Sequence, residues 1–278
     1  MYAITGITGN VGGELARNLL SQGRPVRAVL RDEAKAAEWV ARGCEIALAR
    51  MENGGELAAA FTGAEAVFIL PPNEFDPQPG YPEARRVIDA VVAGLVAKPR
   101  KILCLSTIGA DAPHENLLTQ RTLMEQALAV SGIPTTFLRP AWFMENALWD
   151  VAAAREEGVL RSFLTRAVPM VATRDIGRLA RELIQQEWTG NRIVELEGPA
   201  QISANDLAQA FSTALHKSIR LETVPRGEWQ GLFLAQGMRN PLPRMRMLDG
   251  FNEGWIGFRG QPVKGATTLS EVIAGLVA

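Results

Sequence analysis

Short apolar runs alternate with longer amphipathic segments through the first half of this 278-residue chain. The apolar runs show no polar face, which is typical of strands buried on both sides in a parallel sheet. The segments between them repeat apolar residues every three or four positions and predict helices. Strand–helix alternation with short connections predicts a Rossmann-type, doubly wound α/β fold. The expected strands are residues 2–5, 25–30, 44–49, 66–70, 101–105 and 134–138, and the expected helices are residues 11–22, 33–42, 56–61, 82–97 and 117–131.

The second half of the chain is less regular. Ser203, followed three residues later by Asp206, has the spacing of a helix-capping box. We expect a boundary near residue 140, with a dinucleotide-binding Rossmann domain at residues 1–140 and a smaller substrate-binding α/β part at residues 141–278. The chain is free to cross between the two more than once. The expected helices here are residues 141–157, 174–187, 203–215 and 269–277, and the expected strands are residues 192–196 and 219–224.

A glycine-rich loop joins the first strand to the first helix. The backbone amides and the dipole at a helix N-terminus attract a pyrophosphate. Side chains on the first two glycines would block this approach or forbid the turn, and the third glycine lets the helix sit close to the strand. The alternative is a glycine-rich turn without a ligand, but its position at the head of a βαβ array favours a cofactor site. The residues assigned to this site are Gly6, Thr8, Gly9, Asn10, Val11 and Gly12.

The end of the second strand bears on the choice between NAD and NADP. An acidic residue there usually binds the ribose 2′-hydroxyl, whereas an arginine accommodates a 2′-phosphate. Arg31 is the first residue past the apolar run, so the sequence favours NADP(H) over NAD(H). Asp32 keeps NAD open, because a shift of one residue would exchange the two roles. A further alternative is that Arg31 and Asp32 form an exposed pair that caps the next helix.

Composition excludes several classes of function. The net charge of −1 gives no basic field for nucleic acid or an anionic membrane, and no apolar run is long enough to span a bilayer. Cys44 and Cys104 lie in apolar runs without metal-ligand spacing, so we predict no metal site and no disulfide framework. The N-terminus shows no signal peptide, since the first strand begins at Tyr2. These features predict a cytoplasmic protein that acts on a small molecule.

The acid–base pair of classical short-chain dehydrogenases, a tyrosine with a lysine four residues later, is absent. The only tyrosines are Tyr2 and Tyr81, and Gly6 and Arg85 stand four residues after them. A conjugated acceptor can still take a hydride and then a proton from water or a hydroxyl, with binding and orientation supplying most of the catalysis. Ser106 and Thr107, at the end of the fifth strand, are the candidates for that hydroxyl. The alternative is that they only end the strand.

Three segments together resemble the NmrA-like atypical short-chain dehydrogenases: Gly6-x-Thr8-Gly9-x-x-Gly12, Val29-Leu30-Arg31-Asp32 and Leu138-Arg139-Pro140-Ala141-Trp142-Phe143-Met144-Glu145-Asn146. The resemblance implies an NADP-binding domain, a small C-terminal α/β domain and a substrate cleft between them. It implies that Arg31 contacts the adenosine phosphate. Further cofactor contacts are implied for Leu70, Pro71, Ser106, Thr107 and Pro140, and cleft positions for Trp142, Phe143 and Asn146. Helix packing and capping are the alternative roles for Phe143 and Asn146.

The chain departs from this pattern at two positions. Gln126 stands where relatives often carry a lysine, and Arg50 stands where an acidic residue is common. Two segments keep open roles: the proline-rich residues 71–80 form either a stiff lid over the cofactor or a surface connector, and residues 238–248 form either a substrate lid or a partner surface.

The main hypothesis is an NAD(P)H-dependent reductase that transfers hydride to a quinone-like or other conjugated small molecule. The alternative is a non-catalytic NADP-sensing regulator that binds a protein partner, and the missing Tyr–Lys pair motivates it. A sugar-nucleotide epimerase fits the fold but needs the absent acid–base pair. The sequence makes no prediction of oligomeric state.

Overall fold

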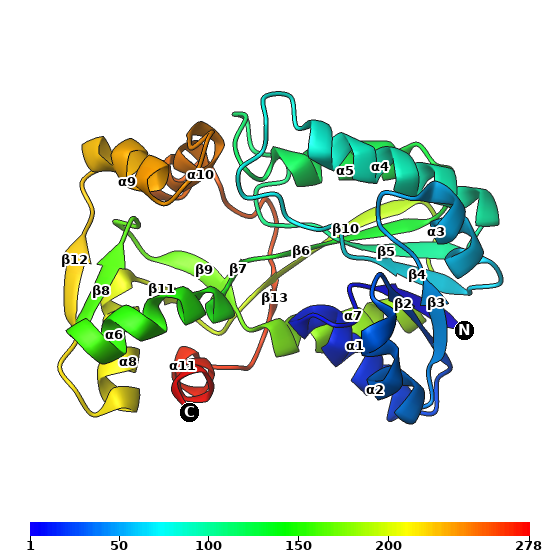
Figure 1. Cartoon of the computed structure of the whole chain (residues 1–278), viewed down its shortest axis with the longest axis horizontal. Coiled ribbons are helices and arrows are strands. Elements are labelled where there is room, and N and C mark those ends of the chain that lie inside the picture. Colours follow the sequence, from blue (N-terminus) through cyan, green and yellow to red (C-terminus); the bar gives the residue numbers. More distant parts are fainter.

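Eight parallel strands form the main sheet of the computed structural model, which describes residues 1–278 (Figure 1). Their order across the sheet is β13-β10-β6-β5-β4-β1-β2-β3. The predicted doubly wound Rossmann-type fold is therefore confirmed. The strands are β1 (Tyr2–Thr5), β2 (Val26–Leu30), β3 (Glu45–Leu48), β4 (Ala66–Ile69), β5 (Lys101–Leu105), β6 (Thr135–Pro140), β10 (Asn191–Glu197) and β13 (Val263–Lys264).

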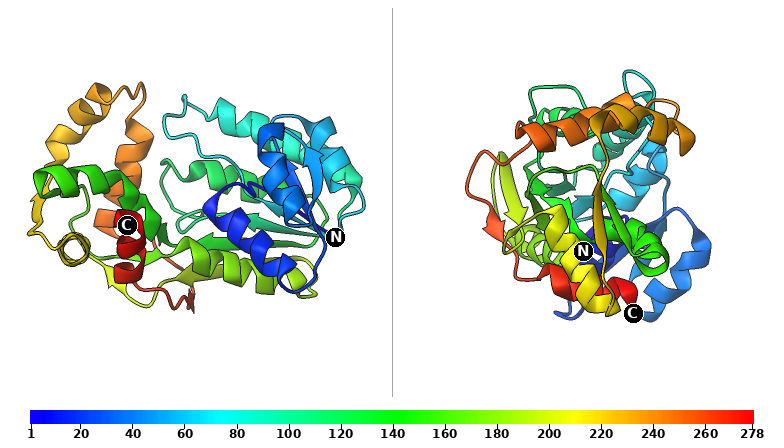
Figure 2. Two further views of the ribbon diagram at one scale, coloured as in Figure 1. Left: turned by 60° about the horizontal axis from the view of Figure 1, so that its bottom comes forward. Right: turned by 90° about the vertical axis from the view of Figure 1, so that its left-hand side faces the viewer.

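Helices cover both faces of this sheet, and each face has its own apolar core (Figures 1 and 2). One face carries α1 (Asn10–Leu20), α2 (Ala36–Ala41) and α7 (Thr173–Gln185). The other carries α3 (Gly54–Phe61), α4 (Pro82–Gly94) and α5 (Thr119–Ala129). The predicted apolar stripe of α1 is buried as expected, because Val11, Leu15 and Leu19 face the sheet.

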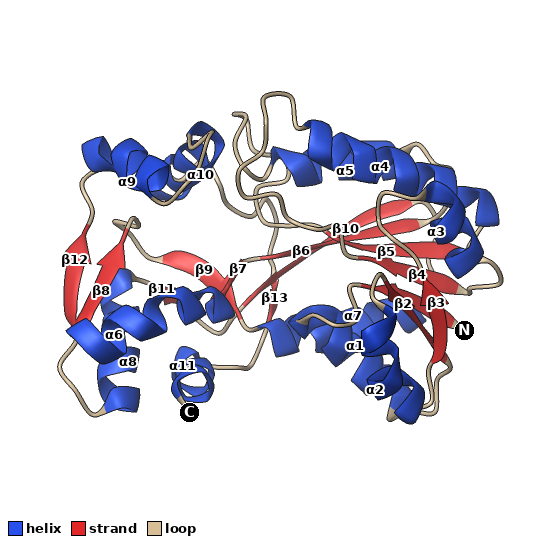
Figure 3. Ribbon diagram, in the orientation of Figure 1, coloured by secondary structure: helices blue, strands red, loops and turns tan.

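A smaller lobe lies beyond the carboxyl ends of the main strands (Figure 3). It contains a three-stranded sheet and a two-stranded sheet, and the helices around them enclose two further apolar clusters. Its elements are β7 (Trp142–Phe143), α6 (Val151–Glu157), β8 (Val159–Ser162), β9 (Val168–Val171), β11 (Gln201–Ile202), α8 (Ala204–Leu215), β12 (Arg220–Thr223), α9 (Trp229–Ala235), α10 (Leu242–Glu253) and α11 (Leu269–Val277).

The expected helix over residues 141–157 is wrong in its first half. Residues 142 and 143 form β7, which pairs with β9, and a 3₁₀ helix at Met144–Asp150 follows before α6 begins. Pairing with β9, a strand the sequence analysis did not find, overrides the helical pattern of this segment. The capping box at Ser203 and Asp206 is confirmed at the start of α8.

The chain returns to the main sheet after residue 140. β10 pairs with β6, β13 pairs with β10, and α7 packs on α1. A division near residue 140 is therefore crossed more than once. No helix of the structure is long and apolar enough to cross a membrane.

The packing of α7 on α1 depends on Gly177. A Cβ added there would lie 2.6 Å from the Cβ of Glu14 and 3.1 Å from the backbone nitrogen of Leu15. We expect Gly177→Ala to lower the free energy of unfolding by about 1–2 kcal/mol, because the two helices must separate. Gly231→Ala is the matched control: it lies within α9 with open space around it, so helix propensity should raise stability by about 0.5–1 kcal/mol. Urea unfolding of both variants measures the difference, and equal effects would contradict the packing argument.

Candidate dinucleotide site

The loop after β1 turns sharply into α1 and leaves the first amides of the helix without side-chain caps. Gly6 has a positive φ of +64°, and the amide of Gly9 donates to the carbonyl of Gly6 at 3.0 Å. Gly9 is the N-cap residue of α1, whose first turn contains no acidic residue. Uncapped amides at the start of an 11-residue helix form a site for an anion.

The glycines of this loop meet different constraints. A Cβ at Gly12 would lie 2.4 Å from the carbonyl oxygen of Gly6, so only glycine allows α1 to pack this closely on β1. A Cβ at Gly9 would meet that same oxygen at 3.4 Å, an ordinary contact, and the backbone angles of Gly9 suit any residue. The fold therefore requires glycine at position 12 but not at position 9.

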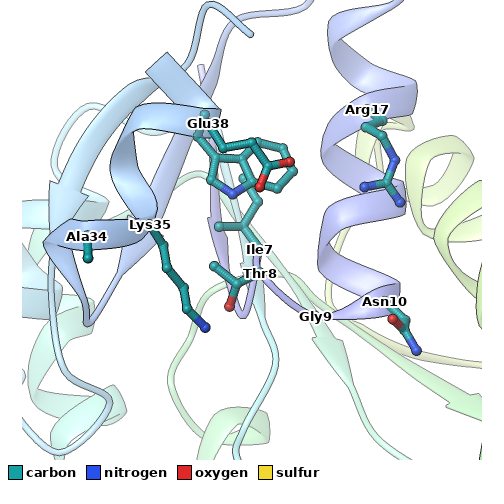
Figure 4. Close-up of a pocket in the computed structure, with 9 residues that line it drawn as sticks. Ile7, Thr8, Gly9, Asn10, Arg17, Ala34, Lys35 and Glu38 are labelled. Carbon is teal, nitrogen blue, oxygen red and sulfur yellow. The ribbon is translucent and has the colours of Figure 1, made fainter. Parts of the chain in front are cut away.

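An open pocket of about 420 Å³ adjoins this loop (Figure 4). Thr8, Gly9 and Asn10 form its floor. Lys35 extends toward Thr8 from the segment after β2, and Arg17 projects from α1 on the opposite wall. Two cations, one carboxylate (Glu38) and a helix N-terminus thus surround one hollow. The cations and the helix amides nearest the loop fit a polyanionic ligand such as a dinucleotide phosphate.

Arg31 directly follows β2, as predicted, and its side chain is exposed and forms no ion pair. It does not line the pocket. Asp32 accepts a hydrogen bond from the amide of Ala34 at 3.0 Å and caps a short 3₁₀ helix. Arg50, the other arginine at the end of a strand, pairs with Glu56 at 2.6 Å.

Sequence reasoning missed Lys35 and Arg17 as pocket residues. Lys35 lies four residues after Arg31, in the segment that had been interpreted only as a helix start, so a search for a second cation after β2 would have found it. No sequence signal identifies Arg17. It lies one helical turn beyond Glu14, its ion-pair partner at 3.1 Å, and looks like an ordinary surface residue.

The remaining predicted cofactor positions meet at the carboxyl edge of the sheet. Leu70 and Pro71 follow β4, Ser106 and Thr107 follow β5, and Pro140 ends β6. Backbone hydrogen bonds hold the ends of β5 and β6 side by side at this edge.

These bonds run from the amide of Ser106 to the carbonyl of Leu138 at 2.7 Å, and from Ile108 to Pro140 at 2.8 Å. Thr5 ties β1 to β4, because its hydroxyl donates to Phe68 O at 3.0 Å and accepts from the amide of Leu70 at 2.8 Å.

A buried polar network lies behind Ser106. The Ser106 hydroxyl donates to Oε1 of Glu125 at 2.5 Å, and Arg139 donates to both oxygens of Glu125 at 2.9 and 2.6 Å. Asp111 pairs with the remaining nitrogen of Arg139 at 3.0 Å. Burial is the largest single influence on Arg139 and lowers its pKa, but the hydrogen bonds and charges of Glu125 and Asp111 together outweigh burial and raise the pKa above its usual value. Gln126, next to Glu125, is exposed, and both residues line a groove of about 310 Å³ with Arg192.

Neither tyrosine is placed to act as a catalytic acid. The hydroxyl of Tyr81 is buried and donates to the carbonyl of Asn116 at 2.8 Å, and burial raises the pKa of Tyr81 to about 12. Tyr2 begins β1, whereas the glycine-rich loop follows the end of β1. Tyr2 therefore lies at the opposite edge of the sheet from that loop. His114 is exposed and stacks edge-on against Trp255.

The three predicted cleft residues lie where the chain leaves the main sheet for the small lobe. The ring of Trp142 contacts that of Phe251 edge-on at a centroid distance of 5.3 Å, and Phe143 packs against the core beneath the main sheet. Asn146 is half-buried and makes no side-chain hydrogen bond. Its neighbour Glu145 accepts from the amide of Thr173 at 2.8 Å and so holds the start of α7.

Hydrogen bonds fix the proline-rich residues 71–80 at two points, at the start of the segment and near its middle. At the root, Arg121 of α5 donates to the carbonyl of Pro71 at 2.8 Å, and burial lowers the pKa of Arg121 to about 10. At the tip, Asp76 accepts from the amides of Arg239 at 2.9 Å and Asn240 at 2.7 Å, in the turn between α9 and α10. This segment therefore connects the main sheet's helices to the small lobe.

The chain is similar to known proteins over most of its length. The sequence profile of the NmrA-like family matches residues 2–252. The NAD(P)H azoreductase of Xenophilus azovorans is 30% identical over 245 residues, which cover 87% of this chain and 83% of the relative. Quinone oxidoreductase 2 of Escherichia coli is 27% identical over 248 residues, which cover 88% of this chain and 85% of the relative.

Solved structures show the same architecture over the whole chain. The NADPH-dependent quinone oxidoreductase 2 of Escherichia coli, complexed with NADPH, superposes with a TM-score of 0.82 at 26% identity and covers 100% of both chains. The triphenylmethane reductase of Citrobacter sp., complexed with NADP(H), has a TM-score of 0.82 at 20% identity and covers 99% of both chains, a likeness of fold.

The anchor at Asp76 gives a testable expectation for residues 71–80. Asp76→Ala removes the acceptor of two backbone amides in the α9–α10 turn, and each lost hydrogen bond to a charged group is worth about 1.5–3 kcal/mol. We expect faster amide hydrogen exchange in residues 71–80 and 236–241 and unchanged exchange in the main sheet. Asp89→Ala, an exposed change on α4 without a hydrogen-bond partner, is the control. Unchanged exchange in both segments would show that Asp76 does not anchor the loop.

Proposed function

Because the chain belongs to the NmrA-like family, we propose that it is an NAD(P)H-dependent reductase of a quinone-like or other conjugated small molecule. The single observation that carries this proposal is the α1 N-terminus with its uncapped amides, which opens onto a pocket that also contains Lys35 and Arg17. The azoreductase is an NAD(P)H enzyme by its name, and the solved quinone oxidoreductase 2 is described as NADPH-dependent. Their alignment spans both lobes of this chain.

NADP(H) is the cofactor we propose. Arg31 follows β2 without an ion-pair partner, and Lys35 reaches into the pocket four residues later. Both cations suit a 2′-phosphate, whose oxygens accept charge-assisted hydrogen bonds. Asp32, the residue that would favour NAD, uses its carboxylate to cap the following turn. These observations support NADP(H) over NAD(H).

At the carboxyl edge of the main sheet, the protein's residues bind the cofactor and the acceptor and orient them. None of these residues serves as a dedicated acid that transfers a proton. A reduced nicotinamide, when bound, supplies a hydride to the acceptor, and one proton must follow to complete the reduction. Trp142 and Phe143 give one wall an aromatic character that suits a planar conjugated molecule. Azo groups and quinones both accept a hydride into a conjugated system, so neither substrate requires a Tyr–Lys pair.

Substitutions at Gly9 and Gly12 distinguish a glycine that leaves space for a ligand from one that the fold requires. Gly9→Ala should leave the melting temperature within about 2 °C of the unsubstituted protein and weaken NADPH binding at least tenfold, because the methyl group occupies ligand space. Gly12→Ala should lower the melting temperature by several degrees, because its Cβ collides with the Gly6 carbonyl. Thermal unfolding and NADPH fluorescence titration measure the two effects. Tight NADPH binding by Gly9→Ala would remove the phosphate loop from the proposed site.

The cofactor preference is tested by titration with NADPH and with NADH. Lys35→Ala and Arg31→Ala should each raise the dissociation constant for NADPH about tenfold or more, since each removes a charge-assisted hydrogen bond to the 2′-phosphate. Binding of NADH should not change. Arg50→Ala, at the end of the neighbouring strand, should change neither, because Arg50 already pairs with Glu56. Equal losses for both nucleotides would contradict a role in recognising the 2′-phosphate.

Activity is tested by adding menadione, and then a panel of quinones, azo dyes and triphenylmethane dyes, to the NADPH complex while following reduced-nicotinamide absorbance. Oxidation of NADPH in step with loss of the acceptor supports the reductase. Tight NADPH binding with no oxidation by any acceptor would favour the alternative, an NADP-sensing regulator that binds a protein partner.

A further inference from the structure

Ser106 has one hydroxyl proton, and the structure shows where that proton goes. The hydroxyl donates to Glu125 at 2.5 Å, and no N–H or O–H group of the protein donates to its oxygen. A serine hydroxyl offers one donor and two acceptor positions. Once the proton points at Glu125, Ser106 can only accept a hydrogen bond from a ligand.

The network behind Ser106 fixes this polarity. Arg139 donates to both oxygens of Glu125, so the carboxylate is held as an acceptor and has no proton to return to Ser106. Asp111 holds Arg139 from the other side at 3.0 Å. The side chains of Arg139 and Glu125 are only 6% and 11% exposed, which limits the water that competes for the serine proton.

Thr107, the neighbouring hydroxyl, differs in this respect. It is less buried than Ser106, whose exposed fraction is 5%, and its side chain makes no hydrogen bond. Its proton is uncommitted. The two hydroxyls therefore present opposite capacities at the end of β5: Ser106 accepts, and Thr107 is able to donate.

The position of Ser106 identifies the part of the cofactor it would meet. Strand β5 lies two places from β1, and the pocket with Lys35 lies on the other side of β1, toward β2. Strands are about 4.8 Å apart, so Ser106 lies roughly 10 Å across the sheet from the phosphate loop. A dinucleotide with its pyrophosphate at α1 and its adenosine toward β2 extends its nicotinamide half toward β4 and β5.

We propose that Ser106 accepts a hydrogen bond from the amide N–H of the nicotinamide carboxamide, and that Glu125 and Arg139 position it for this contact. The inference rests on the proposed function, because it requires a nicotinamide cofactor. It gives Ser106 a role in orienting the ring and assigns it no part in proton delivery. The proton that completes the reduction comes from Thr107 or from water.

The test compares NADP⁺ with its 3-acetylpyridine analogue, in which a methyl group replaces the carboxamide nitrogen and the carbonyl oxygen remains. The readout is the dissociation constant from tryptophan fluorescence or calorimetry, so no substrate is needed. Ser106→Ala should weaken NADP⁺ binding about fivefold to tenfold and leave binding of the analogue unchanged. Binding of 2′,5′-ADP, which lacks the nicotinamide half, should also stay unchanged and shows that the variant is folded.

Thr107→Val is the matched control. A hydroxyl that donates contacts the carbonyl oxygen, which both cofactors carry, so this variant should affect them equally. Glu125→Gln tests the network: a Gln side chain that donates to Ser106 frees the serine proton to face the ligand, and the preference for NADP⁺ over the analogue should fall. If Glu125→Gln does not fold, Ser106→Ala alone decides.

Equal losses for NADP⁺ and the analogue in Ser106→Ala, or no loss for either, would overturn the proposal. Loss of discrimination in Thr107→Val instead would assign the acceptor to Thr107 and overturn it as well. If the unsubstituted protein binds neither NADP⁺ nor 2′,5′-ADP, the proposed function itself fails, which is a separate result from failure at Ser106.

Discussion

The close approach of Gly12 to the carbonyl of Gly6 sets the geometry on which the rest of the structure depends. Without a Cβ at position 12, α1 begins directly over the end of β1, and its first amides face the carboxyl edge of the sheet. The position of α1 then determines that of α7, which packs against it at Gly177. α7 precedes β10, so the same contact places the strand that extends the main sheet beyond β6. One backbone approach thus links the phosphate loop to the part of the sheet built from the second half of the chain.

The first half of the fold could be predicted because its signals are local. Buried parallel strands are apolar on both faces, and α1 repeats apolar residues at helical spacing. Each of these elements can therefore be predicted from its own residues. The second half depends on partners far along the chain. β7 has two residues and exists because β9 pairs with it. β8, which the sequence analysis also did not find, pairs with β12 about 60 residues later in the chain. Short strands of this kind carry no period that a sequence analysis can detect.

The candidate site divides in the same way. The place of Arg31 directly after β2 could be predicted, because the end of a parallel strand defines a position in space as well as in sequence; its contact with the cofactor stays a prediction. Arg17 could not be predicted, since only the folded structure brings its position on α1 to the pocket. Ser106 and Thr107 were equivalent in the sequence. The structure distinguishes them by burial and by the hydrogen bond of Ser106 to Glu125, 19 residues away on α5.

The buried Glu125–Arg139 pair is poorly explained as a source of stability and better explained by its effect on a neighbouring group. Burying two charges costs desolvation energy that their attraction scarcely recovers, so such pairs are poor sources of stability. Here the pair lies at the carboxyl edge of β5 and β6, where ligands collect in this fold, rather than in either apolar core. Its one side-chain hydrogen bond outside the ionic groups is to the Ser106 hydroxyl. In a chain that lacks the Tyr–Lys pair, what this arrangement of charges can supply is a fixed hydrogen-bond acceptor that would orient the ring of the proposed nicotinamide cofactor.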